Sequence, residues 1–87
     1  MSNASVVTSI RNLLRRFEAR EVPTSTISEQ IADYVSALEG LRGENLRALR
    51  DTANRLEFAT FADKEFPGEN PQDVLRELHA LLDSVPQ

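Results

Sequence analysis

Apolar residues recur at steps of three and four along four stretches of the chain, the spacing that places them on one face of an α-helix. The stretches cover residues 5–20, 27–39, 44–65 and 71–85. None of them shows the alternation of apolar and polar residues that is typical of a strand. The pattern therefore predicts an all-α fold, a small four-helix bundle in which residues 5–87 form a single domain.

Local signals predict where the first two helices end and begin. Pro23 disfavours helix at the residue before it, so the first helix should end near Arg20. Thr26 and Glu29 have the spacing of a capping box, which predicts that the second helix starts directly after Thr26. Gly40 is suited to a left-handed turn at the end of that helix.

The last helix has a similar set of signals. Pro67 and Gly68 should end the third helix. Asn70 then offers a side-chain cap, Pro71 suits the first helical position, and Asp73 lies near the positive end of the helix dipole.

The third stretch is expected to be the central helix of the bundle. Ala53 and Leu56 share one face, whereas Phe58 and Phe61 lie well round from it. We therefore expect the helix to contact neighbours on more than one side, including the side of these rings. Phe61 either belongs to the core or its edge, or faces solvent as a binding anchor. The change of face permits one continuous helix or two segments with a bend near residues 51–57. The absence of glycine and proline inside the stretch favours the continuous helix.

The size and composition indicate an ordinary globular domain. The 87 residues are 40% hydrophobic and 28% charged, enough for one core. No cysteine is present, so no disulfide or thiolate metal site is expected. Because no apolar run is long enough to span a membrane, we expect a soluble, cytoplasmic protein without a membrane partner. Residues 1–4 (MSNA) resemble an expression-tag remnant.

Charge is distributed unevenly along the chain. Residues 1–50 carry seven basic and six acidic groups, a net charge of +1, whereas residues 51–87 carry three basic and eight acidic groups, a net charge of −5. An acidic second half repels phosphate backbones, so nucleic acid is not expected as the main partner. Four arginines still give the first helix a basic flank. A nucleic-acid-binding regulator that uses this flank is therefore a lower-ranked alternative function. The four arginines are Arg11, Arg15, Arg16 and Arg20.

The sequence contains little catalytic chemistry. His79 is the only histidine, and no second histidine or Glu-x-x-His pattern accompanies it, so we expect it at the surface or the core edge. The three glycines form no phosphate-binding loop. We expect no enzyme activity, no metal and no cofactor.

A dense set of carboxylates is the one unusual feature. Solvation and dipole compensation explain part of it, including Asp73 at a helix start. Asp63 and Glu65 instead lie near the negative end of the third helix, where their charge is slightly unfavourable, and this suggests a role outside the fold. The set comprises Glu57, Asp63, Glu65, Glu69, Asp73 and Glu77.

Several segments resemble the colicin D immunity family and its relatives among contact-dependent growth inhibition immunity proteins. They are the Ile-x-x-Tyr-Val pattern ending at Val35, the segment 56–63 (LEFATFAD) before an acidic turn with a proline, and the Val-Leu-x-x-Leu pattern ending at Leu78. Members of that family are small acidic helical proteins that block the cleft of a basic tRNA-cleaving toxin domain. The resemblance implies partner-binding roles for Asp63, Glu65, Glu69 and Asp73.

These observations lead to a specific expectation of function. The chain should be an immunity protein that binds a cognate nuclease toxin domain, with carboxylates in the positions that substrate phosphates would take. The alternative from another class is a helical adaptor or regulatory module whose partner is an amphipathic helix. The sequence leaves the oligomeric state open.

Overall fold

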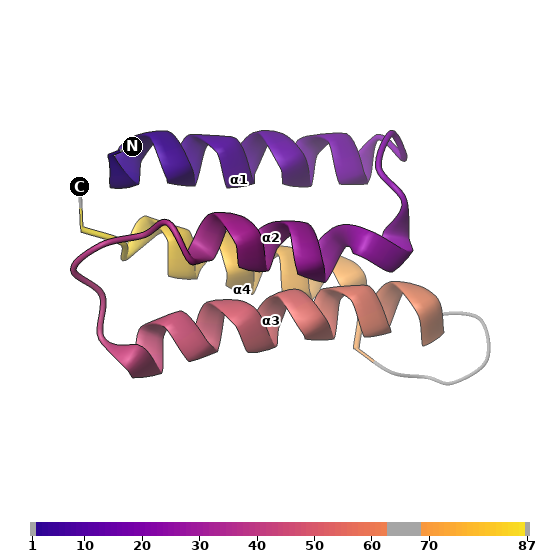
Figure 1. The fold of residues 1–87 in the computed structure, drawn as a ribbon. Coiled ribbons are helices and arrows are strands. Elements are labelled where there is room, and N and C mark those ends of the chain that lie inside the picture. The colour runs from indigo at the N-terminus through magenta and orange to yellow at the C-terminus, as the bar shows by residue number, and fades with distance from the viewer. Residues whose placement is uncertain (1, 63–68, 87) are drawn as a thin grey trace.

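The computed structural model describes residues 2–62 and 69–86, which form four α-helices and one short 3₁₀ helix (Figure 1). The described residues contain no strand, so the predicted all-α four-helix bundle is confirmed. No helix within these ranges is long and apolar enough to cross a membrane. The elements are α1 (Asn3–Glu18), η1 (Thr24–Thr26), α2 (Ile27–Val35), α3 (Gly43–Ala62) and α4 (Pro71–Asp83).

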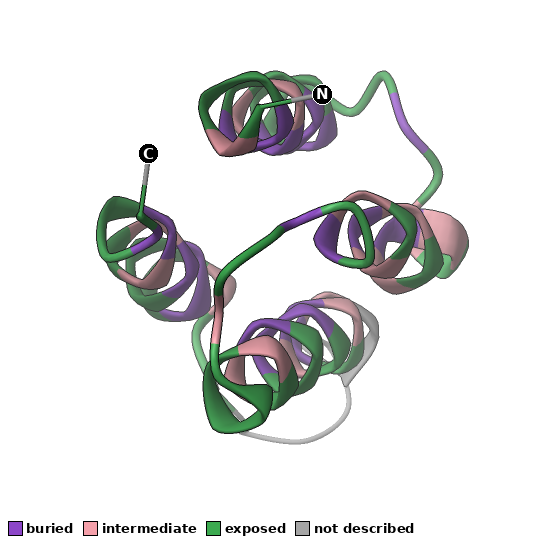
Figure 2. Cartoon of the chain, turned by 60° about the vertical axis from the view of Figure 1, so that its left-hand side comes forward, coloured by how far each residue is buried: buried purple, intermediate pink, exposed green. Residues whose placement is uncertain are grey.

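The helices follow one another around the bundle in chain order. α3 packs against α2 and α4, and α1 packs against the same two helices. An end-on view shows the buried positions of all four helices facing the centre (Figure 2). α1 and α3 therefore lie at opposite corners, and α3 has helical neighbours on two sides, as does each of the other helices.

The predicted apolar stripes form a single core. The stripes of α1, α2 and α4 are buried almost completely, with only Tyr34 and Leu81 partly exposed at the edge. All four helices therefore depend on the same buried cluster. The largest fully buried side chains are Val6, Ile10, Leu14, Ile27, Ile31, Val35, Leu49, Leu56, Val74, Leu78 and Leu82.

α3 is one continuous helix, as the absence of internal glycine and proline predicted. Its core face includes Ala53 and Leu56, which are both fully buried. Phe58 is 72% exposed, so the prediction that its ring packs against a neighbour is wrong. The physical reason is that α2 and α4 cover the two flanks of α3, whereas Phe58 lies on the side opposite Leu56. The predicted helix end at Pro67–Gly68 lies outside the described residues.

The start of α2 differs from the predicted capping box. Thr26 belongs to η1, has φ −117° and ψ 0°, and accepts no hydrogen bond from the α2 backbone. Because the 3₁₀ turn runs directly into α2, Thr26 cannot adopt the extended backbone of a capping residue. Glu57 of α3 supplies an acceptor instead, since its Oε1 receives the Ser28 N–H at 3.4 Å.

α1 ends in a Schellman motif in which Arg20 takes the left-handed conformation, with φ 63°. The Arg20 N–H donates to the Phe17 carbonyl at 3.0 Å, and the Glu21 N–H donates to the Arg16 carbonyl at 2.9 Å. The helix covers Asn3–Glu18, so it begins and ends about two residues earlier than the apolar pattern indicated.

The predictions for the end of α2 and for the start of α4 differ in how well they agree with the structure. Gly40 has φ 75°, the predicted left-handed conformation, but α2 ends at Val35 and Gly40 lies in the connection to α3. The start of α4 agrees with the prediction: the Asn70 Oδ1 accepts the Gln72 N–H at 2.9 Å, and Pro71 is the first helical residue.

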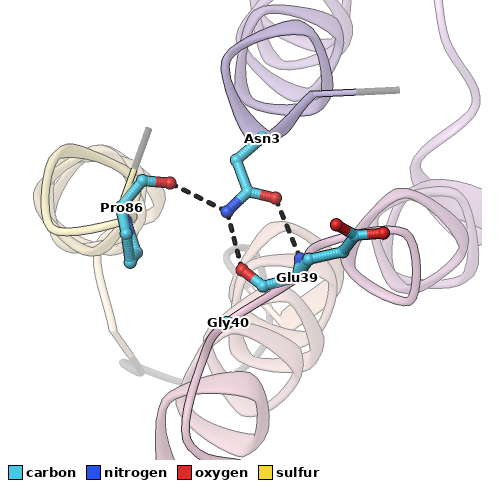
Figure 3. Close-up of a pocket in the computed structure, with 4 residues that line it drawn as sticks. All are labelled: Asn3, Glu39, Gly40 and Pro86. Carbon is cyan, nitrogen blue, oxygen red and sulfur yellow. Dashed lines mark hydrogen bonds between the residues drawn. The ribbon is translucent and has the colours of Figure 1, made fainter.

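Asn3 joins three separate parts of the chain at the end of the bundle where both termini lie (Figure 3). Its Nδ2 donates to the carbonyl oxygens of Glu39 at 2.7 Å and Pro86 at 2.8 Å, and its Oδ1 accepts the Glu39 N–H at 2.9 Å. We call this arrangement the Asn3 latch. Ser2 also caps α1 by accepting the Ser5 N–H. The tag origin of residues 1–4 stays a prediction, but in this fold Ser2 and Asn3 hold helix ends.

Replacing Asn3 with alanine should destabilise the protein by about 1 to 2 kcal/mol, because three partly solvated hydrogen bonds are lost together. Urea unfolding followed by circular dichroism measures the change. Asn12→Ala is the matched control on the same helix, since the exposed Asn12 side chain only accepts from Arg15, and it should change stability by less than about 0.5 kcal/mol. Equal effects of the two substitutions would contradict a structural role for the latch.

Candidate partner-binding surface

The four residues predicted to bind a partner divide into two pairs. Asp63 and Glu65 lie outside the described residues. Glu69 and Asp73 flank the start of α4, on a short connection and in the first helical turn respectively. Both carboxylates of this second pair are already engaged within the molecule.

Glu69 holds the guanidinium of Arg55 together with Glu77. Arg55 Nε and Nη2 donate to the two carboxylate oxygens of Glu69 at 3.0 and 2.5 Å. Arg55 Nη1 and Nη2 donate to the two oxygens of Glu77 at 2.8 and 2.9 Å. We call these three residues the Arg55 clamp, and the two bidentate contacts join α3 to the residue before the Asn70 cap and to the middle of α4.

The Arg55 clamp changes the acid–base properties of its carboxylates. Hydrogen bonds from Arg55 lower the pKa of Glu69 and of Glu77 below their ordinary value, and the two carboxylates raise the pKa of Arg55. The side chains of Glu69 and Glu77 are about half exposed, so solvent screens much of this interaction.

The other described carboxylates of α3 and α4 in the acidic set also have internal partners. Asp73 Oδ1 accepts from Arg76 Nη2 at 2.7 Å, one helical turn away. Glu57 accepts from the start of α2, as described above. The described part of the predicted acidic surface is therefore a set of internal pairs, with a smaller net charge than its carboxylates alone would give.

The basic flank of α1 is likewise divided. Arg11 Nη1 lies 2.8 Å from Nδ1 of His79, and Arg11 Nη2 pairs with Asp83, so Arg11 joins α1 to α4. His79 is partly buried, in agreement with the predicted core-edge position. Reversing the charge of Arg11 would disturb the fold, whereas Arg15 and Arg16 are exposed and suit a test of nucleic-acid binding.

Phe58 is the candidate binding residue that the sequence pattern misassigned. It is the large hydrophobic side chain with high exposure in the described part of the chain. Its position on the outer side of α3 was visible in the helical pattern, but the pattern does not tell which sides of a helix are covered. A single exposed ring of this size is suited to insert into a partner pocket.

Among residues 2–62 and 69–86, pockets occur at both ends of the bundle. One, of about 440 Å³, is lined by Asn3, Glu39, Gly40 and Pro86, and the Asn3 latch already uses its polar groups (Figure 3). The other, of about 550 Å³, lies at the opposite end of the bundle, where α1 ends and α4 begins. Within residues 2–62 and 69–86, no group of histidine and carboxylate side chains is placed to hold a metal ion.

Comparison with known proteins adds no assignment. No protein-family model, no curated protein and no solved structure matches this chain. Functional interpretation therefore depends on the surface itself.

Acidification should weaken the fold partly through the Arg55 clamp. Since the folded-state pKa values of Glu69 and Glu77 are depressed, their stabilising contribution is present above their ordinary pKa of 4.5 and is lost as the pH falls through the lowered values. Acidification should therefore lower the stability of Arg55→Met less than that of the unsubstituted protein. The reason is that the variant lacks the guanidinium that stabilises the ionised forms of Glu69 and Glu77.

Thermal unfolding at a series of pH values below neutrality measures this difference. Arg42→Met is the matched control, since Arg42 pairs with Glu44 at 3.7 Å at a highly exposed position. Its acid sensitivity should equal that of the unsubstituted protein. An Arg55→Met variant with unchanged acid sensitivity would show that the clamp does not couple stability to pH.

Proposed function

We propose that this chain is an immunity protein that binds and neutralises a cognate nuclease toxin through an aromatic anchor beside a group of carboxylates. The observation that carries the proposal is the exposure of Phe58 on α3, five residues before Asp63. The acidic second half of the chain and the family resemblance support it. Aromatic anchors supply much of the affinity of such interfaces, whereas charges guide and select the partner.

The internal ion pairs of Glu69 and Asp73 limit the role that these two carboxylates can have in binding a partner. A basic side chain of the toxin could bind Glu69 or Asp73 closely only by displacing Arg55 or Arg76. We therefore assign Glu69 and Asp73 to the long-range field that attracts a basic partner. Direct contacts are assigned to Phe58 and, on the sequence argument, to Asp63 and Glu65. The proposal places this complex in the cytoplasm, which the cysteine-free sequence supports.

The exposed ring of Phe58 also fits one other class of function. A helical adaptor would pack Phe58 against the apolar face of a partner helix, since an outward aromatic residue on a helix suits that mode of recognition. The two classes differ in their response to salt. Association with a basic toxin slows as salt screens the attraction, whereas docking of an apolar helix changes little.

If a toxin domain is encoded immediately upstream of this chain, Phe58→Ala should weaken binding to it by at least about thirtyfold, the loss typical of an interface hot spot. Its unfolding free energy should change by less than about 0.5 kcal/mol, because the ring is largely exposed in the free protein. Isothermal titration calorimetry measures the affinity. Arg16→Ala is a control of similar size on the exposed side of α1, and it should bind normally. Failure of the unsubstituted protein to bind this toxin domain would overturn the immunity proposal.

Charge reversal tests the carboxylates separately. Asp63→Lys combined with Glu65→Lys should weaken toxin binding at least about a hundredfold, since close charge pairs at nuclease–inhibitor interfaces couple by roughly 1.5 to 7 kcal/mol. Surface plasmon resonance at low and high salt separates association from dissociation.

The matched control changes the net charge equally at another face. Glu21→Lys combined with Asp33→Lys alters two exposed residues near the C-terminal ends of α1 and α2, where positive charge is tolerated. This variant should retain most of the affinity. If both double reversals weaken binding equally, net charge rather than a defined acidic site determines recognition.

A further inference from the structure

The pocket of about 550 Å³ lies at the end of the bundle away from the termini. Phe17 of α1, Val22 of the following loop and Leu75 of α4 line it, and all three are buried apolar residues of the core. Glu18 and Arg20 also line it and are exposed. The pocket therefore combines an apolar floor with a charged rim, and its volume falls within the range of small-molecule sites.

Arg20 occupies this rim in a backbone conformation that favours glycine. Its φ of 63° lies in the left-handed region, which costs a residue with a Cβ roughly 1 kcal/mol. The chain uses glycine at Gly40, the other described position with positive φ. Arginine at position 20 is therefore costly for the fold, and what it adds relative to glycine is its side chain.

Arg20 supplies the positive charge among the residues that line this pocket. Pro71 and Gln72 at the start of α4 line the same pocket, but Pro71 has no N–H and the Asn70 Oδ1 already accepts the Gln72 N–H, so these two residues add no free backbone donor. At the end of α1, the carbonyl groups of Arg16 and Phe17 are likewise engaged, in the Schellman hydrogen bonds. Glu18 on the rim disfavours a multiply charged ligand.

We propose that this pocket binds a small amphipathic anion, with a single carboxylate against Arg20 and an apolar chain or ring over Phe17, Val22 and Leu75. The site is distinct from the Phe58 surface and does not depend on the proposed toxin. Arg20 is then the residue that determines specificity for an anion, and the strain in its backbone is the stability cost of that recognition.

Titration of the ¹⁵N-labelled protein with 3-phenylpropanoate, followed by amide chemical shifts, tests the proposal. The amides of Val22, Thr24 and Gln72 should shift in a saturable manner. The neutral isostere 3-phenylpropanamide should bind roughly tenfold more weakly, since it lacks the charge that Arg20 recognises. The absence of shifts at these positions, or equal binding of the acid and the amide, would overturn the proposal.

Arg20→Gly separates recognition from folding. Glycine relieves the left-handed strain, so the variant should unfold a few degrees higher, while its affinity for 3-phenylpropanoate falls about tenfold. Arg15→Gly is the matched control on α1, outside the pocket: it should lower the unfolding temperature and leave the affinity unchanged. An Arg20→Gly variant that still binds the carboxylate normally would show that Arg20 does not hold the anion.

Discussion

Burial of four amphipathic helices around one core is the constraint on which the rest of the structure depends. α2 has nine residues and α4 has thirteen, lengths at which an isolated helix is marginal in water. Each helix is therefore stable only while its apolar stripe contacts the stripes of the other helices. In a chain of 87 residues this core leaves a small margin of stability, so hydrogen bonds that fix the helix ends matter more than they would in a larger domain.

The polar contacts divide between the two ends of the bundle. The Asn3 latch joins the start of α1, the α2–α3 connection and Pro86, which follows the end of α4, at the end of the bundle where the termini lie. Towards the other end, the Arg55 clamp joins α3 to α4, and Glu57 caps α2. Most described carboxylates of the predicted acidic surface thus have a structural partner, and a charge that stabilises the fold is less available to a partner protein.

The periodicity of the sequence was sufficient to predict the helices and the core, because the spacing of apolar residues determines which of them share a face. It was insufficient wherever the answer depended on a distant residue. Arg55 meets Glu69 fourteen positions later, Ser28 meets Glu57 after twenty-nine, and Asn3 meets Pro86 after eighty-three. Phe58 was misassigned for the same reason, since a pattern within one helix does not show which of its sides another helix covers.

The features without an evident structural role lie towards one end of the molecule. Phe58 lies in the second half of α3, on its outer side, and the pocket with Arg20 lies where α1 ends and α4 begins. Both are costly or neutral for folding: an exposed ring gains nothing from burial, and a left-handed arginine is strained. The Asn3 latch at the opposite end contacts neither of them. Substitutions at Phe58 and Arg20 can therefore change binding while the core and the latch keep the bundle folded.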